Sequence, residues 1–184
     1  MQPPSDHLLR TLAAVPVSSH ILDVGCGSGR HTEPLLRLGF PVRACDVRDG
    51  AVEATRERIT EDVGADTAAQ CVQQVAPDGF GAYPDDAFHW IVAFNPVGYL
   101  RDADALPAWL TEMRRLLVPG GWLYFAVSRT TDPAVNGMAL PLLSPEELEA
   151  SAQAAGLAIS TPPERDEEDG IPLVRAIFRH VTET

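Results

Sequence analysis

The feature that most constrains the fold is a short strand that runs through a glycine-rich turn directly into a helix. An apolar strand pattern covers residues 20–24, glycines stand at alternate positions in 25–29, and a helical pattern covers 30–38. A second strand over 41–46 ends in Asp46, about 20 residues after the first glycine, where a carboxylate can accept hydrogen bonds from ribose hydroxyls. Glycine allows the tight turn and the close approach of a ligand. The segment predicts a nucleoside-binding βαβ unit.

The glycine spacing distinguishes between cofactors. A dinucleotide-binding loop has the pattern Gly-x-Gly-x-x-Gly, which lets a pyrophosphate sit on the helix N-terminus. Here the glycines are Gly25, Gly27 and Gly29, and Arg30 stands where the third glycine of that pattern would be. An acid, Asp23, lies two residues before the first glycine. A carboxylate there suits a ligand with a cationic amine better than one with a phosphate.

Two later segments extend the pattern. Residues 83–94 read as the approach to a fourth strand, and residues 113–125 as a helix, a Pro-Gly-Gly turn and a fifth strand. Together with the glycine loop, in this order, they resemble the motifs of the class I S-adenosylmethionine-dependent methyltransferases over roughly residues 18–128. The resemblance implies an α/β Rossmann-like fold, with a seven-stranded, mostly parallel sheet, helices on both faces and an antiparallel last strand.

The resemblance also implies S-adenosyl-L-methionine as the cofactor, with the glycine loop under its methionine part and Asp46 on its ribose. Two positions depart from the family's pattern: His89 replaces an acid, and Asp78 is the nearest counterpart of the acid expected after strand three. The cofactor-binding residues predicted in this way are Asp23, Gly25, Cys26, Gly27, Gly29, Asp46, Val47, Asp78, Gly79, Phe80, Phe94 and Asn95.

Alternating strand and helix patterns fill the rest of the chain. Apolar residues from Leu106 to Leu117 repeat at helical spacing, and Ser144-Pro-Glu-Glu147 is a capping box that starts another helix, with Gly156 as its stop. The run of acids at 164–169 is expected to be a solvated turn. The other predicted elements are a helix at 5–14, a helix at 50–62, and strands at 69–75, 89–94, 157–161 and 172–181.

Length and composition indicate one domain over residues 1–184, since this length suffices for one core and not for two. Residues 1–19 would form a cap helix, and 128–143 is the insertion long enough to act as a lid. No apolar run is long enough for a membrane span, and the first residues lack a signal-peptide pattern. Cys26, Cys45 and Cys71 read as reduced thiols rather than a disulfide framework or metal site. We expect a cytoplasmic protein.

The net charge of −12 bears on partners, because all 14 basic residues are arginines and they form no cluster. Nucleic-acid binding depends on neutralising phosphates, so neither DNA nor RNA is an expected partner. A membrane partner is not expected either. The modest cover over the site fits a small-molecule acceptor, and the chain is expected to be a monomer or homodimer.

Methyl transfer to an activated acceptor needs positioning and exclusion of water more than covalent chemistry. The catalytic residues are therefore left open, with His31, Asn95 and Tyr99 as candidates near the ligand. His31 reads as an exposed polar residue, Tyr99 as packing over cofactor or acceptor, and His89 as a core histidine. Asn95-Pro96 lacks the second proline and adjacent tyrosine of the nucleic-acid amino-methyltransferases.

The sequence thus predicts methyl transfer from S-adenosylmethionine to a small molecule. The alternative is a methyltransferase-fold subunit that binds the cofactor without catalysis and serves a partner chain. A nicotinamide-dependent oxidoreductase is a third interpretation, which the missing third glycine disfavours.

Overall fold

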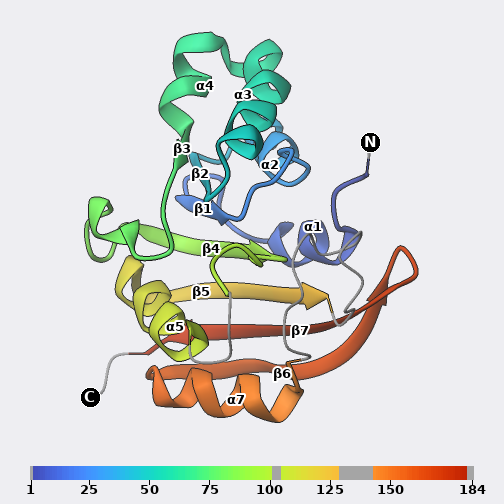
Figure 1. The fold of residues 1–184 in the computed structure, drawn as a ribbon, viewed down its shortest axis with the longest axis vertical. Coiled ribbons are helices and arrows are strands. Elements are labelled where there is room, and N and C mark those ends of the chain that lie inside the picture. The colour runs from blue at the N-terminus through green and yellow to red at the C-terminus, as the bar shows by residue number, and fades with distance from the viewer. Residues whose placement is uncertain (1, 101–104, 129–142, 182–184) are drawn as a thin grey trace.

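A seven-stranded sheet organises the molecule, in the order β3-β2-β1-β4-β5-β7-β6 (Figure 1). The computed structural model describes residues 2–100, 105–128 and 143–181. Strands β1 to β5 pair in parallel, and β7 is antiparallel to both of its neighbours. The predicted fold class is therefore confirmed. The strands are β1 Ile21–Val24, β2 Val42–Asp46, β3 Val72–Gln74, β4 Phe88–Phe94, β5 Leu117–Ser128, β6 Leu157–Glu168 and β7 Ile171–His180.

Helices cover both faces of the sheet, because alternate residues of the central strands point to opposite sides. On β4, Trp90 and Val92 belong to the core cluster under α1 and α2, whereas Ile91 and Ala93 belong to the cluster under α5 and α7. Helices α3 and α4 cover the β2–β3 end (Figure 1). The helices are α1 Asp6–Leu12, α2 Thr32–Arg37, α3 Asp49–Val63, α4 Ala65–Cys71, the 3₁₀ turn η1 Gly79–Ala82, α5 Ala105–Leu116 and α7 Pro145–Ala154.

Two helix starts follow directly from their capping residues. Ser5 caps α1 by accepting a hydrogen bond from the Leu8 amide, and Ser144 forms the predicted reciprocal capping box with Glu147. The predicted apolar stripe is also present, since α5 buries Leu106, Trp109, Leu110, Met113 and Leu116 against the sheet. Local sequence therefore fixes these elements.

Strand three is shorter than predicted. The sequence prediction of 69–75 is wrong at its start, because residues 69–71 form the last turn of α4 and β3 covers only Val72–Gln74. The alanines and glutamine of 65–71 are good helix formers, and Ala68 is buried in the cluster formed with Val52 and Ile59 of α3. Helix packing against α3 outweighs strand pairing for these residues.

The acidic run at 164–169 is not the solvated turn that the sequence suggests. Its first five residues lie in β6, which pairs with β7 as far as the Glu168–Ile171 pair. The turn itself is only Asp169-Gly170, and both residues have positive φ angles, 54° and 76°. An Asp-Gly pair with positive φ at both positions closes a two-residue hairpin whose twist matches its strands. The hairpin is therefore longer than predicted.

Candidate functional site

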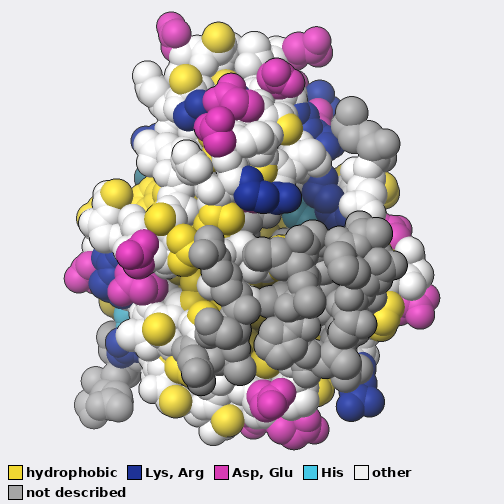
Figure 2. All heavy atoms as spheres, in the orientation of Figure 1, with side chains coloured by type: hydrophobic (Ala, Val, Ile, Leu, Met, Phe, Trp, Pro, Cys, Tyr) yellow, Lys and Arg dark blue, Asp and Glu magenta, His cyan; other side chains and the backbone are white. Residues whose placement is uncertain are grey.

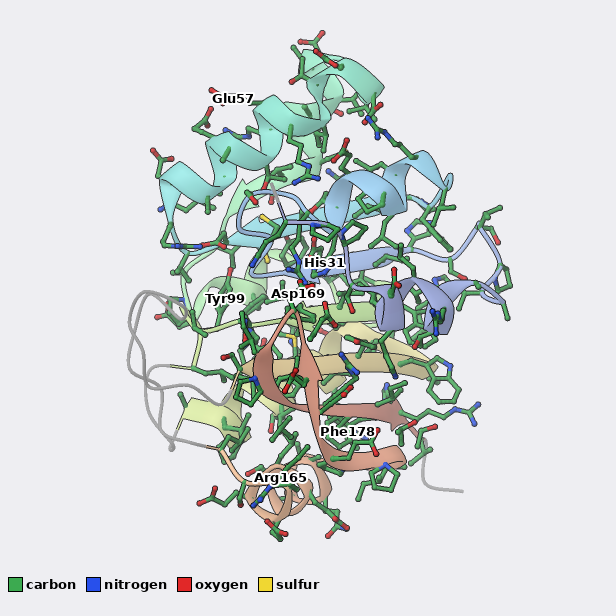
Figure 3. All side chains as sticks on the ribbon, turned by 90° about the vertical axis from the view of Figure 1, so that its right-hand side faces the viewer. His31, Glu57, Tyr99, Arg165, Asp169 and Phe178 are labelled. Atoms are coloured by element: carbon green, nitrogen blue, oxygen red, sulfur yellow. The ribbon has the colours of Figure 1, made fainter. Side chains whose placement is uncertain are left out.

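The carboxyl ends of the parallel strands meet at one edge of the sheet, where ligands bind in open α/β folds. Because β7 runs antiparallel, its first residues and the hairpin turn before it reach this same edge. Figure 3 shows the hairpin rising past the strands, with Asp169 at its tip near the level of His31. The edge thus has two parts: a glycine loop after β1, and a wall formed with the hairpin beside β4 and β5.

The glycine loop joins β1 to α2, and its three predicted glycines all have positive φ. A Cβ atom at Gly25 would lie 3.1 Å from the Pro96 Cα, and one at Gly29 would lie 3.1 Å from the Thr55 side chain. A Cβ atom at Gly27 would meet nothing closer than 4.0 Å. Packing therefore accounts for the outer two glycines, whereas the middle one borders open space that a ligand can use.

Asp46 at the end of β2 faces this loop. Its Oδ2 accepts a hydrogen bond from the Gly27 amide at 3.1 Å, and its Oδ1 accepts one from the Arg48 amide at 3.0 Å. The Arg48 guanidinium also contacts Oδ1 at 3.2 Å, and Asp46 is only 3% exposed. The carboxylate is thus held against the backbone of the loop, beside the open space at Gly27.

Asp23 is a second buried carboxylate beside the loop, only 1% exposed. Its Oδ2 accepts a hydrogen bond from the Thr32 hydroxyl at 2.6 Å. Burial, helped by the charge of Asp46, raises the pKa of Asp23 to about 6, although the Thr32 hydrogen bond and Arg30 oppose the shift. Among the described residues Asp23 has no ion-pair partner, so a ligand cation nearby would stabilise its charged form.

The residues between loop and strand ends complete this part of the edge. Cys26 is buried, and the Thr55 hydroxyl lies 3.4 Å from its Sγ, while burial raises the pKa of the thiol. Val47 is half-buried beside Asp46, and Gln74 donates a hydrogen bond to its carbonyl at 3.0 Å. Because its pKa is raised, the Cys26 thiol stays protonated and acts as a small apolar group rather than a nucleophile.

At the end of β4, Phe94 and Asn95 also lie at this edge. Asn95 has a positive φ of 53°, and its Oδ1 accepts a hydrogen bond from the Ser128 amide at 2.5 Å. The backbone amide of Asn95 donates a hydrogen bond to the Ala126 carbonyl at 2.7 Å. These bonds join the ends of β4 and β5 and fix the orientation of the Asn95 side chain.

Tyr99 and Phe80 of the η1 segment lie in the core cluster under α5. The Tyr99 hydroxyl donates to the Val75 carbonyl at 3.1 Å, and its ring lies 5.2 Å from that of Phe80, with both side chains in the core under α5. Asp78 is exposed just before η1, and Gly79 begins it. The structure thus brings the glycine loop, Asp23 and Asp46 together, whereas the Tyr99 hydroxyl is used within the core.

His31 is not the exposed residue that the sequence suggests. It is buried at the start of α2, with its ring 4.9 Å from that of Phe94. Arg30 donates from Nε to the His31 Nε2 at 3.0 Å. Burial, together with the charges of Arg30 and Arg58, lowers the pKa of His31 to about 3. The ring is therefore neutral at physiological pH and its Nε2 lone pair is occupied.

His89 also differs from expectation, since it is exposed rather than buried in the core. It lies near the start of β4, at the end of the strand away from Asn95, where its Nδ1 accepts a hydrogen bond from the His20 amide at 3.1 Å. The alternation along β4 puts its neighbours Phe88 and Trp90 inside. The burial of its neighbours does not extend to His89 itself.

A cavity of about 330 Å³ lies between the strand ends and the hairpin. Arg30 forms one wall, with its guanidinium 4.7 Å from the Phe94 ring centre and 2.9 Å from Glu168. Glu168 in turn accepts hydrogen bonds from the Ser5 hydroxyl at 2.7 Å and from Arg175 at 2.8 Å. The residues lining the cavity are Gln2, Arg30, Phe94, Asn95, Ser128, Glu168, Asp169, Ile171 and Leu173.

Comparison with known proteins identifies the family to which this combination of loop and sheet belongs. The family described as a methyltransferase domain matches residues 21–121. The chain belongs to this methyltransferase family. A ubiquinone biosynthesis O-methyltransferase of Chelativorans sp. (strain BNC1) is 28% identical over 156 residues, which cover 74% of this chain and 58% of the relative. The methyltransferase chain spans about half the length of the curated relatives it matches.

Solved structures agree with the methyltransferase fold. A SAM-dependent methyltransferase from Methanosarcina mazei superposes with a TM-score of 0.70 at 17% identity, over 99% of this chain and 100% of that one. The N-methyltransferase NodS from Bradyrhizobium japonicum WM9 gives a TM-score of 0.70 at 19% identity, over 96% of this chain and 93% of that one. At these identities the likeness concerns the fold alone.

S-adenosylmethionine is the cofactor that membership of this methyltransferase family implies, and the residues at the loop fit it. The space at Gly27 is open, Asp46 lies beside it, and Asp23 offers a buried carboxylate. The described residues contain no group of three or more His, Cys, Asp or Glu arranged to hold a metal ion. None of the helices described is both long and apolar enough to cross a membrane.

The hairpin side of the candidate site is absent from the sequence predictions. Glu168 was assigned to a solvated turn, yet its side chain is only 16% exposed and pairs with Arg30 across 138 residues of sequence. Nothing in the sequence near Glu168 marks it, since its partners are Ser5, Arg30 and Arg175. The sequence-predicted lid at 128–143 lies outside the described residues except for Ser128 and Leu143.

Proposed function

We propose that this chain transfers a methyl group from S-adenosylmethionine to a small-molecule acceptor. The observation that carries the proposal is the open space at Gly27, bordered by a loop with three positive φ angles and by the buried carboxylate of Asp46. Such a loop accepts a ligand against its backbone without a Cβ in the way. The family match over residues 21–121 supports the same reaction.

We assign the roles of the loop residues from their charge and place. Asp46 accepts hydrogen bonds from the ribose hydroxyls, and Asp23 stabilises the cationic amine of the methionine part. The predicted set also includes Gly25, Cys26, Gly27, Gly29 and Val47 around the loop, Phe94 and Asn95 at the end of β4, and Asp78, Gly79 and Phe80 on the adenine side.

The bound cofactor supplies an already activated methyl group, so the chain's own residues need to hold and orient the acceptor and exclude water. His31 is unsuited as a base, because its pKa is lowered to about 3 and Arg30 occupies its Nε2. Tyr99 is unsuited as well, because its hydroxyl is bonded to Val75 within the core. Of the three candidates, Asn95 is the one that lines the cavity, and we assign it the role of positioning the acceptor.

The surface supports a small acceptor rather than a nucleic acid. Figure 2 shows acidic and basic side chains interspersed on this face, with no extended basic patch among the residues it colours. With a net charge of −12, phosphate backbones would meet repulsion. We propose further that the chain works as a monomer or homodimer in the cytoplasm, where its free thiols Cys26, Cys45 and Cys71 would stay reduced.

Calorimetry with S-adenosylhomocysteine and NAD tests the cofactor. We expect dissociation constants on the order of micromolar for S-adenosylhomocysteine, about −8 kcal/mol, and no measurable binding of NAD. The reverse preference would refute the proposal. The double variant Asp23→Ala/Asp46→Ala is the control that should bind neither.

Turnover is tested by release of S-adenosylhomocysteine from S-adenosylmethionine with a panel of phenols, amines, thiols and carboxylates. We expect release with at least one small acceptor and none with DNA or RNA. The competing possibility is a non-catalytic subunit. Stable association with another methyltransferase chain, whose activity is restored equally by the Asp23→Ala/Asp46→Ala variant, would establish that role instead.

A further inference from the structure

The cavity beside the hairpin contains a buried hydroxyl without a partner. Ser128 is the last residue of β5, is 6% exposed and lines the cavity, and its Oγ has no hydrogen-bond partner among the described residues. Leaving a buried hydroxyl unpaired costs free energy, so most such groups have a partner. A ligand in the cavity can supply that partner.

Asn95 provides a second polar group beside this hydroxyl. Because its Oδ1 accepts the Ser128 amide hydrogen at 2.5 Å, its Nδ2 is left to donate. A hydroxyl or an uncharged amine could accept from the Asn95 Nδ2 and donate to the Ser128 Oγ. The two side chains come from the ends of adjacent strands, where the reacting atoms of an acceptor would meet the cofactor.

Two of the charged groups around the cavity, Arg30 and Glu168, are already paired. Arg30 donates to His31, to Gln2 at 3.1 Å and to Glu168, and it stacks on Phe94. Glu168 receives three hydrogen bonds, from Ser5, Arg30 and Arg175. Neither charge is therefore available to form a full ion pair with a ligand.

The hairpin tip adds an unpaired negative charge. Asp169 lines the cavity and forms no ion pair with the described residues. Of the charged residues that line the cavity, one is a cation, Arg30, and two are carboxylates, Glu168 and Asp169. An anionic ligand would meet this excess negative charge without an unpaired cation to bind.

We infer that this cavity is the acceptor subsite, in which Ser128 and Asn95 bind a hydroxyl or amino group of an uncharged or cationic small molecule, and Asp169 disfavours carboxylates and phosphates. Phe94, Ile171 and Leu173 give the acceptor's body an apolar surface. A volume of about 330 Å³ suits a compact molecule. The inference rests on the proposed function and adds the class of acceptor to it.

Two probes of the same shape test the charge preference. 4-Hydroxybenzamide and 4-hydroxybenzoate carry the same phenol and differ in the charge of the group opposite to it. With the full chain saturated with S-adenosylhomocysteine, calorimetry should give at least about tenfold tighter binding of the amide. Equal or tighter binding of the benzoate, or no binding of either probe at millimolar concentration, would overturn the inference. Failure of S-adenosylhomocysteine to bind would instead refute the proposed function.

Two variants separate the hydroxyl from the charge. Ser128→Ala should weaken the amide about tenfold, whereas Ser151→Ala on the outer helix α7 should not change its binding. Asp169→Asn should reduce the preference for the amide to about threefold or less, and asparagine tolerates the positive φ at this position. Affinity for S-adenosylhomocysteine, measured in each variant, shows that the fold and the cofactor site are intact. Unchanged probe binding in both site variants would contradict the assignment.

Discussion

The two sides of the site are built in different ways. On the loop side, the interacting groups are close in sequence, as in the hydrogen bond from Gly27 to Asp46 across 19 residues. On the hairpin side, the bonds from Arg30 and Ser5 to Glu168 span 138 and 163 residues. Backbone geometry leaves a mark on residue type, because positive φ angles and a close ligand demand glycine. Pairing between distant side chains leaves no local mark.

The strongest test of the loop side is Gly27→Val. The side chain would fill the space that the cofactor needs, and a β-branched residue is strained at a φ of 59°. We expect S-adenosylhomocysteine affinity to fall on the order of 1000-fold, about 4 kcal/mol, by calorimetry.

Gly39→Val is the matched control for Gly27→Val. Gly39 also has a positive φ, 93°, but a Cβ there meets nothing within 4 Å and lies outside the loop. The control shares the backbone strain and should bind the cofactor normally. Normal binding by Gly27→Val would place the ligand elsewhere.

The next largest effect concerns the pH dependence of stability through Asp23. Burial raises its pKa to about 6, so the folded chain holds this proton more tightly than the unfolded chain does. Asp23 therefore contributes stability at low pH, and that contribution is lost as pH rises from about 4 to about 6. Asp23→Asn should remove the loss.

The measurement for Asp23→Asn is urea unfolding of the free chain at pH 3 and pH 7.5. We compare the free energy of unfolding of the variant with that of the parent at each pH. The variant's value minus the parent's should increase by about 3 kcal/mol from the lower to the higher pH. Asp66→Asn on the exposed surface of α4 should show no such change. An equal difference at both pH values would show that Asp23 has an ordinary pKa.

Asp46→Ala tests the ribose contact with a smaller expected effect. Removing a charged acceptor should weaken S-adenosylhomocysteine by about ten- to a hundredfold, about 1.5–3 kcal/mol. Asp66→Ala is the control, since that exposed carboxylate lies on α4. A loss of less than twofold for Asp46→Ala would remove this carboxylate from the cofactor site.

The hairpin side is tested by Glu168→Gln, with the smallest expected effect. The loss of charge leaves Arg30 without its ion pair and Arg175 with Asp166 as its partner, and we expect the free energy of unfolding to fall by about 1–2 kcal/mol. This is below the cost for a fully buried pair, because the two side chains keep 15% and 16% exposure. Cofactor affinity should change little, whereas Glu167→Gln should change neither property. A large loss of cofactor affinity would show that the two sides are not separable.

Much of the fold can be predicted from the sequence, because its signals, like those of the glycine loop, lie close together along the chain. The glycine turn, the Ser144 capping box and the apolar stripe of α5 each rest on residues a few positions apart. Strand three was misplaced because the packing of Ala68 against α3, rather than local propensity alone, decides where α4 ends. Long-range packing is the information that a local pattern lacks.

The same difference between local signals and long-range contacts applies to the residues of the site. The spacing of Asp23, Asp46 and the glycines predicts a cofactor site, and in the structure Asp46 bonds the loop at Gly27 while Asp23 is a buried carboxylate beside the loop. The burial of His31 was missed, because it depends on Phe94 and Arg30 closing over the ring. The role of Glu168 was missed, because an acid in an acidic run looks solvated unless its partners are known.

The short turn at Asp169-Gly170 has a consequence for the order in which the molecule assembles. A hairpin with a two-residue turn of this kind can form on its own within about 1–10 μs. The hydrogen bonds that Ser5 and Arg30 donate to Glu168 form only when segments more than a hundred residues away are in place. The hairpin beside β5 therefore forms early, whereas its hydrogen bonds to the rest of the chain form late. In native-state hydrogen exchange, it should open before the central strands do.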